Sequence, residues 1–378
     1  MNNNYCKSPW TGVFIETDGS VKSCCAGGHY WGNLNENTID EILTKPEVIG
    51  IKQGIINNQP VEYCKGCRRD EEATGYSLRN YYDQFTTTNE LLNSANDFVL
   101  RNIDIRWNAL CNLNCVYCNE RSSTKWQGLK GIPIESLERQ YYDHVLDFIK
   151  RNGQDLEVVL LVGGEPLLPR QNRNLLDNIP DDKHIDLISN LSSNLDNNQV
   201  FQRLQSKKDV SWQVSFESIG SKFEYVRHGA NWKLFVDNLK KVKSIPGHRI
   251  TALPVYCIYS ALNLIEIYEF IQEIDIQIHW QKLWGPNYLN VTNFSPRIKQ
   301  LAIEEISRVL DLPYLDKFTS GMNRVFFENQ LKELTGSSDQ NVDSEFLKWT
   351  EKYETTYATD AGKLADVFPK LNDALRSQ

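Results

Sequence analysis

From residue 101 to residue 283 the chain alternates apolar segments with amphipathic ones. The apolar segments predict strands, at residues 102–107, 157–162, 184–189, 211–216, 251–258 and 276–283. Between them apolar residues recur at helical spacing, at 137–149, 232–242 and 264–271. Alternating strands and helices imply right-handed crossovers and a parallel sheet. We therefore expect an α/β fold, a partial (βα)6 TIM-like barrel that is short of the closed eight-stranded one.

The two ends of the chain follow other patterns. Residues 13–17 and 20–24 alternate in polarity around Asp18-Gly19, which predicts a hairpin because this dipeptide accepts the positive φ angles of a tight turn. Residues 38–54 predict short helices, and the stretch after 296 is helical and polar. We expect an N-terminal Cys-rich α+β module (1–97), the barrel (98–295) and a helical C-terminal segment (296–378).

Composition and charge narrow the class of protein. The 378 residues are 40% hydrophobic and 24% charged, near the averages of globular proteins. Apolar runs such as 158–162 are far shorter than the roughly 20 residues that cross a bilayer. The first residues resemble neither a secretory signal nor a transit peptide, so we expect a cytoplasmic protein. The net charge of −8 gives no reason to expect a nucleic acid partner.

Cysteine is the most informative residue type. The chain has nine cysteines, and all but Cys257 fall at or before residue 118. An odd count in a chain without an export signal makes a disulfide framework a poor interpretation. Clustering of this kind indicates a metal site instead.

Three cysteines share the loop that follows the first predicted barrel strand: Cys111, Cys115 and Cys118. Three thiolates can bind three of the four irons of a cuboidal cluster, which leaves one iron open to a substrate or cofactor. The loop lies at the C-terminal end of its strand, where barrels of this kind carry their chemistry. A structural zinc site needs a fourth ligand, and no cysteine nearby supplies one.

The Cys-x3-Cys-x2-Cys spacing, with Tyr117 before the last cysteine, resembles that of radical S-adenosylmethionine (radical SAM) enzymes. The next strand runs into Gly163-Gly164-Glu165-Pro166, which resembles the GGEP motif of the same family. Two glycines let the backbone approach a ligand closely. Exposed carbonyls and Glu165 can accept hydrogen bonds from the ammonium group of the cofactor.

The resemblance implies a mechanism. In that family SAM binds the open iron through its amino and carboxylate groups, and an electron from the 4Fe-4S cluster cleaves the sulfonium. The resulting 5′-deoxyadenosyl radical abstracts hydrogen from a substrate. Four further residues resemble the family's polar contacts to SAM, among them a serine and an arginine for the ribose and carboxylate: Ser189, Asn190, Ser215 and Arg227. Ordinary loop hydrogen bonding is the alternative for Ser189, Asn190 and Arg227.

The N-terminal cysteines form a second set: Cys6, Cys24, Cys64 and Cys67. Four thiolates fill every corner of a 4Fe-4S cluster. The Cys-x12-Gly-x4-Cys run with a later Cys-x2-Cys is similar to the Twitch half of SPASM/Twitch auxiliary modules, here placed before the barrel as in the N-terminal Twitch subgroup. We expect one auxiliary cluster, with a zinc ribbon as the alternative.

Two cysteines remain. Neighbours on a strand point to opposite faces, so we expect Cys24 to be a ligand and the adjacent Cys25 not to be one. Cys257, alone in an apolar strand, is expected in the core.

The predicted function is a radical SAM oxidoreductase or modifying enzyme, with two 4Fe-4S clusters and SAM as cofactors. The resemblance favours a peptide or protein substrate and an external electron donor such as flavodoxin or ferredoxin. The first alternative is a dehydrogenase of a small molecule, such as a sugar, an aminocyclitol or a nucleotide. An alternative of another class is a non-catalytic zinc-binding interaction module, which leaves the Cys111–Cys118 loop and the GGEP motif unexplained.

Overall fold

The computed structural model describes residues 5–74, 77–85, 94–134, 140–283, 285–318, 322–336, 340–358, 360 and 362–376. The chain divides into two compact units. Unit 1 comprises Met1–Leu110, Ile134–Leu187 and Asp196–Ser211, and unit 2 comprises Cys111–Pro133, Ile188–Leu195 and Trp212–Gln378. The division falls within two strands, β6 (His184–Ser189) and β7 (Val210–Val214). No helix of the described residues combines the length and the apolar character that a membrane span requires.

Unit 1 is built on a largely parallel sheet. β1 (Gly12–Ile15), β4 (Asn102–Ile105), β5 (Val158–Leu161) and β6 pair in parallel. β2 (Ser20–Lys22) and β3 (Gly32–Asn33) add antiparallel strands beside β1. The predicted hairpin is therefore confirmed, with Gly19 in its turn at a φ of 85°. The parallel pairing of β1 with β4 was not predicted, because partners about 90 residues apart leave no local signal.

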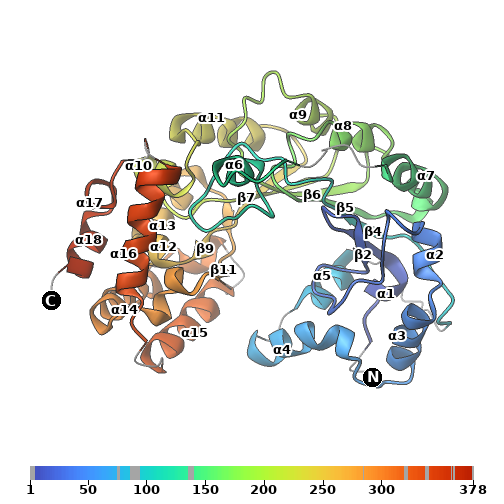
Figure 1. Ribbon diagram of the computed structural model, residues 1–378, viewed down its shortest axis with the longest axis horizontal. Helices are drawn as coiled ribbons and strands as arrows, with labels where there is room; N and C mark the ends of the chain where they lie inside the picture. The colour runs from blue at the N-terminus through green and yellow to red at the C-terminus, as the bar shows by residue number, and fades with distance from the viewer. Residues whose placement is uncertain are drawn as a thin grey trace. The chain divides into compact units, whose positions relative to one another are not determined.

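Along the chain, the helices of unit 1 precede the strands and alternate with them (Figure 1). The N-terminal residues carry α1 (Ser8–Thr11), α2 (Ile39–Leu43), α3 (Pro46–Ile56), the 3-10 turn η1 (Glu62–Cys64), α4 (Lys65–Thr74) and α5 (Leu78–Phe85). Thr38 and Glu41 form a capping box at α2, which fixes where that helix begins. The later helices are α7 (Tyr142–Asn152), α8 (Arg170–Asp177) and α9 (Gln199–Leu204). Residues 135–139, where the predicted helix 137–149 begins, lie outside the described residues.

Unit 2 contains the remaining strands. β8 (His248–Ala252) pairs in parallel with β10 (Gln277–Ile278), and β9 (Val255–Tyr256) pairs in parallel with β11 (Gln281–Lys282). Each of the last two predicted strands is thus split in two. Pro254 stands at the first break and has no N–H to donate to a neighbour. The helices are α6 (Thr124–Leu129), α10 (Gly220–Val226), α11 (Trp232–Lys243), α12 (Ile258–Ala261) and α13 (Leu264–Ile274).

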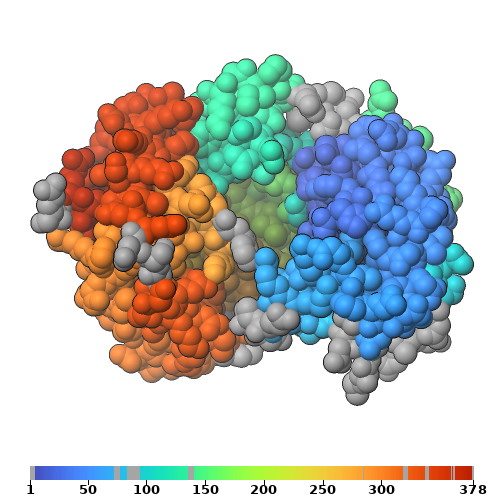
Figure 2. All heavy atoms as spheres, turned by 60° about the horizontal axis from the view of Figure 1, so that its bottom comes forward, coloured from blue at the N-terminus to red at the C-terminus, as the bar shows by residue number. Residues whose placement is uncertain are grey.

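The C-terminal segment of unit 2 is helical, as predicted. Its elements are α14 (Pro296–Leu310), α15 (Met322–Gly336), α16 (Asp343–Lys352), a π-helical turn (Tyr353–Tyr357), α17 (Leu364–Val367) and α18 (Pro369–Arg376). The space-filling view shows the atoms of this segment in orange to red (Figure 2). The α/β class with parallel strands is confirmed, whereas the domain boundaries near 97 and 295 stay predictions.

Candidate functional site

The loop with Cys111, Cys115 and Cys118 follows β4, and the start of α6 holds its first half. The backbone N–H of Cys111 donates to the Thr124 hydroxyl oxygen at 3.2 Å, and that hydroxyl faces the Cys111 carbonyl at 3.3 Å. Ser123 caps α6, and its hydroxyl donates to the carbonyl of Leu113 at 2.7 Å. The polar residues that begin a helix therefore also fix the shape of this loop.

The second half of the loop is held by backbone contacts with the end of α10. The N–H of Val116 donates to the carbonyl of Val226 at 2.9 Å, and the N–H of Asn114 donates to that of His228 at 3.1 Å. The indole N–H of Trp126 donates to the carbonyl of Cys115 at 3.1 Å. The loop is thus fixed from two sides.

The loop thiols lie in surroundings that favour metal binding over a free thiolate. Cys115 is buried, and Cys111 and Cys118 are half-buried. Burial raises the pKa of the Cys115 thiol, although the Arg227 guanidinium opposes this effect. Burial likewise raises the pKa of Cys118. A bound metal supplies the positive charge that such thiols need to ionise, so their chemistry fits an iron–sulfur cluster.

Three of the residues expected to contact SAM lie at the ends of β6 and β7. Asn190 Nδ2 is 3.9 Å from the sulfur of Cys111 and donates to Asn112 Oδ1 at 2.9 Å. The hydroxyl of Ser189 accepts the N–H of Leu191 at 2.9 Å. The N–H of Ser215 donates to the carbonyl of Ser189 at 3.1 Å. Asn190 is therefore the member of this set that meets the cysteine loop directly.

Arg227 is engaged by a carboxylate of the protein. Its Nε and Nη2 donate to the two oxygens of Glu217 at 2.9 and 2.7 Å, and Nη1 is 3.9 Å from the sulfur of Cys115. The guanidinium carbon lies 5.5 Å from the centre of the Tyr117 ring. Arg227 and Glu217 are only 5% and 0% exposed. Glu217 lies two positions after Ser215 and was not among the predicted site residues. Its pairing with Arg227 depends on the fold and leaves no signal in the sequence.

The GGEP turn of unit 1 packs against the backbone that immediately precedes Cys111. Gly163 has a φ of 122°, which side chains disfavour. A Cβ on Gly164 would lie 2.4 Å from the carbonyl oxygen of Leu110. The N–H of Glu165 donates to the same oxygen at 2.8 Å. The backbone conformation thus favours glycine at position 163, and the close contact with Leu110 requires it at position 164.

The last two residues of this turn are also held firmly. The Glu165 side chain is buried, and its Oε1 accepts the N–H of Leu167 at 3.2 Å. The carbonyl of Pro166 accepts the Asn172 side-chain amide at 2.7 Å. The turn that was expected to contact SAM is therefore well ordered by its own hydrogen bonds.

The four N-terminal cysteines come together in unit 1. A single cavity is lined by Cys6, Cys24, Cys64 and Cys67. Burial and the neighbouring thiols raise the pKa of Cys6 and Cys24, and they raise that of Cys64 to about 12. Among the described residues, no three His, Cys, Asp or Glu side chains are arranged around one metal ion. A 4Fe-4S cluster makes a different demand, because each cysteine binds a different iron.

Cys25 differs from its neighbour Cys24. It is exposed and does not line this cavity, and the charges that act on its thiol come from Asp104, the adjacent Cys24, Arg106 and Lys22. The structure thus directs Cys24 toward the other three cysteines and Cys25 elsewhere. Cys257 is fully buried at the start of α12.

The C-terminal segment, which was predicted only to be helical and polar, makes hydrogen bonds to the cysteine loop. The hydroxyl of Tyr353 donates to the carbonyl of Asn114 at 3.2 Å, and the Asn114 side-chain amide donates to the carbonyl of Tyr357 at 3.3 Å. The rings of Trp349, Tyr353 and Tyr357 lie 6.1, 6.2 and 5.0 Å from that of Trp126. The spacing of these three aromatic residues, four positions apart, was the available signal.

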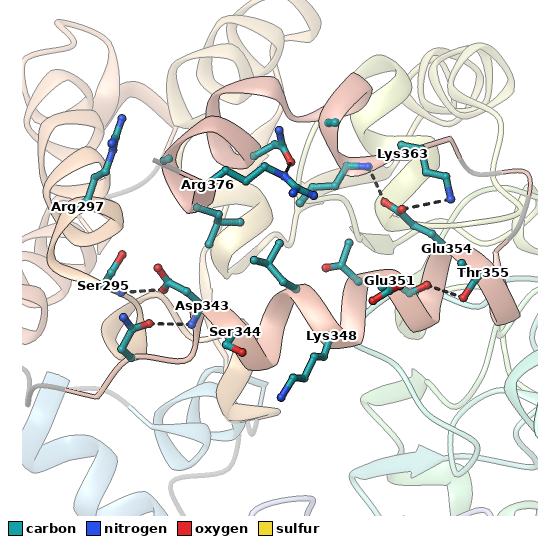
Figure 3. A pocket seen from close by; sticks show the side chains of 18 of the residues that line it. Ser295, Arg297, Asp343, Ser344, Lys348, Glu351, Glu354, Thr355, Lys363 and Arg376 are labelled. Carbon is teal, nitrogen blue, oxygen red and sulfur yellow. Dashed lines mark hydrogen bonds and ion pairs between the residues drawn. The ribbon is translucent and has the colours of Figure 1, made fainter. Parts of the chain in front are cut away.

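A larger cavity of about 1200 Å³ lies between α14, α16 and the last two helices (Figure 3). Its walls carry charges of both signs, and several are paired with each other. Glu354 forms an ion pair with Lys363 at 3.5 Å, and Asp343 accepts the N–H of Ser295 at 3.0 Å. None of the residues predicted to bind SAM or iron lines it.

Two family models match the chain. Residues 6–68 match SPASM, an iron–sulfur cluster-binding domain, and residues 107–271 match the radical SAM superfamily. The chain therefore carries a radical SAM domain, preceded by a SPASM-type iron–sulfur cluster-binding domain. These two domains imply SAM and 4Fe-4S clusters as its cofactors.

Individual relatives are distant. The chain is 28% identical over 140 residues to 7-carboxy-7-deazaguanine synthase of Methanocaldococcus jannaschii, a match that covers 36% of this chain and 54% of that protein. SuiB of Streptococcus suis bound to S-adenosylmethionine is 15% identical, with a TM-score of 0.42 over 71% of this chain and 60% of SuiB. AnSMEcpe with bound AdoMet is 14% identical, with a TM-score of 0.41 over 56% of this chain and 60% of its own. The matches thus span less than two thirds of these relatives' lengths.

Proposed function

We propose that the protein reductively cleaves SAM at a 4Fe-4S cluster held by Cys111, Cys115 and Cys118 and abstracts hydrogen from a peptide or protein. The observation that carries this proposal is the arrangement of the loop. Three thiols of one short loop are fixed by α6 and α10, and Asn190 and Arg227 each approach one of their sulfurs. Three ligands leave one iron of a cuboidal cluster for SAM.

When bound, the cluster supplies the electron that splits the sulfonium of SAM, and the 5′-deoxyadenosyl radical so released takes hydrogen from the substrate. The chain's own residues position the reactants and exclude water. Trp126 and the C-terminal aromatic residues cover the loop, and Ser123 and Thr124 hold its backbone. We propose that Gly163, Gly164, Glu165 and Pro166, with Ser189, Asn190 and Ser215, form the polar surroundings of SAM.

We propose that a second 4Fe-4S cluster is held by Cys6, Cys24, Cys64 and Cys67. Their convergence on one cavity supports this assignment. Four cysteines occupy all four irons, so this cluster has no open position and is suited to electron transfer. When bound there, this cluster would take up or supply an electron after hydrogen abstraction, and an external donor such as flavodoxin or ferredoxin would reduce the first cluster.

A peptide or protein is the preferred substrate, because the SPASM-type domain resembles the auxiliary modules of peptide-modifying radical SAM enzymes. A small molecule, such as a nucleotide, is the second candidate. It is favoured by one finding, namely that the relative with 28% identity is named 7-carboxy-7-deazaguanine synthase.

The test is SAM cleavage. Protein reconstituted with iron and sulfide without oxygen, and then given a strong reductant, should convert SAM to 5′-deoxyadenosine and methionine. Chromatography quantifies both products. If wild-type protein with both clusters assembled yields no 5′-deoxyadenosine, the proposal is wrong.

A further inference from the structure

Glu217 and Arg227 form a fully buried ion pair beside a cysteine of the catalytic loop. The carboxylate engages Nε and Nη2 of the guanidinium, which leaves Nη1 directed at the sulfur of Cys115, 3.9 Å away. The guanidinium carbon lies over the ring of Tyr117, 5.5 Å from its centre, which limits the space into which the cation can move. One fixed N–H edge of the cation therefore points at a thiolate that the proposed cluster uses.

We propose that Glu217 is a positioning residue that holds Arg227 against Cys115, and that this pair raises the reduction potential of the cluster at Cys111, Cys115 and Cys118. The inference rests on the proposed cluster. It assigns to Glu217 a role that the sequence pattern did not give it, and it assigns to Arg227 a target within the protein.

The physical reason is the change of charge on reduction. An added electron makes the cluster more negative, so a nearby cation or N–H donor stabilises the reduced form. The effect is large here because both partners are buried and little water screens them. The pair is neutral overall, but its positive end is the end that faces the sulfur.

Glu217 is needed because a guanidinium in this position has no other fixed orientation. A buried cation without its partner is costly, and a carboxylate that accepts two parallel N–H bonds sets both the position and the plane of the arginine. The same contact occupies the edge of Arg227 that would otherwise grip the carboxylate of a ligand. The remaining edge, at Nη1, faces the sulfur of Cys115.

The experiment is a redox titration of the full-length reconstituted protein without SAM, followed by low-temperature electron paramagnetic resonance. The signal lost in Cys115→Ala identifies the cluster. Glu217→Gln keeps a side-chain oxygen that accepts from the guanidinium, and so keeps Arg227 in place, but it removes the negative charge. The reduced-to-oxidised ratio at a fixed potential should therefore rise about tenfold, which is 59 mV for one electron. Glu217→Gln combined with Arg227→Met replaces the pair by neutral side chains, and this ratio should fall several-fold below wild type.

Glu305→Gln is the matched control. Glu305 is also a buried carboxylate, and its ion pair with Arg308, at 2.8 Å, does not involve the cysteine loop. The cluster potential of this variant should equal that of wild type. If only one of the two variants, Glu217→Gln or Glu217→Gln with Arg227→Met, assembles the cluster, the potential of that variant is sufficient to test the inference. An unchanged or opposite potential overturns the inference, as does a double variant that keeps the wild-type potential and loses only SAM affinity. A wild-type protein that forms no cluster removes the proposed function and this inference together.

Discussion

The hydroxyl of Tyr353 reaches 239 positions back along the chain to donate a hydrogen bond to the carbonyl of Asn114, in the middle of the cysteine loop. Tyr353 lies in a π-helical turn, and such turns often occur at functional sites. The contact links the helical C-terminal segment to the loop that is proposed to bind the catalytic cluster. The C-terminal segment therefore helps to hold the candidate cysteine loop in place.

Tyr353→Phe should make the cysteine loop less stable, so that it retains its cluster less firmly but still binds it. The substitution leaves a buried carbonyl without its donor, which costs about 1–2 kcal/mol. We expect faster loss of iron from the loop on incubation with a chelator, measured by absorbance. Tyr357→Phe is the control, because Tyr357 meets the loop through its backbone carbonyl. Equal iron loss from both variants would show that the Tyr353 hydroxyl has no such role.

Replacing any one cysteine of the loop should abolish SAM cleavage. Cys111→Ala, Cys115→Ala and Cys118→Ala each remove one of only three ligands, and 5′-deoxyadenosine should fall to background. Cys257→Ala is the control, because this buried thiol lies at the start of α12 and serves neither cluster. Undiminished cleavage in a loop variant would refute the ligand assignment.

Cys24 and Cys25 should behave differently although they are adjacent. Cys24→Ser should lower the iron content by about four atoms per chain, because the N-terminal cluster loses a ligand. Cys25→Ser should leave iron content unchanged, since its side chain does not line the cysteine cavity. Iron analysis of the two variants checks this, and the reverse order would mean that Cys25 is the ligand.

Gly164→Ala should damage the site through sterics alone. The added methyl would lie 2.4 Å from the Leu110 carbonyl oxygen, so backbone must move. We expect a loss of about 1–3 kcal/mol in unfolding free energy, together with slower SAM cleavage. Gly50→Ala, in the open middle of α3, should instead be neutral or stabilise the protein by about 0.5–1 kcal/mol. Urea denaturation compares them, and a Gly164→Ala protein as stable as wild type would contradict the packing.

The sequence was sufficient for the local features of the site and insufficient for its long-range partners. The cysteine spacing, the hairpin around Gly19 and the alternation of strand and helix each depend on neighbouring residues. Glu217 and Tyr353 were missed because their partners are ten and more than a hundred positions away and are brought near by tertiary structure. The strand predicted at 251–258 is split at Pro254, which the apolar pattern concealed.

Asp104 should make stability depend on pH. This carboxyl is buried on β4, and burial raises its pKa from 3.8 to about 6. Between these values the folded state binds more protons than the unfolded state, so the unfolding free energy falls as the pH rises through this window. The shift corresponds to about 3 kcal/mol.

Asp104→Asn should remove the part of the fall in unfolding free energy with rising pH that is due to this carboxyl. The unfolding free energy of the variant relative to wild type should increase by about 2–3 kcal/mol between pH 4 and pH 7. Asp147→Asn, at an exposed carboxylate in α7, should show no such change. Denaturation at a series of pH values provides the measurement, and a constant difference between Asp104→Asn and wild type would contradict the raised pKa.

The most direct test of the two proposed clusters is the metal and sulfide content of the protein purified and reconstituted without oxygen. Two 4Fe-4S clusters predict about eight iron atoms and eight sulfide ions per chain, with zinc well below one. Stoichiometric zinc with no iron or sulfide would contradict the assignment of both cysteine sets, and with it the proposed chemistry.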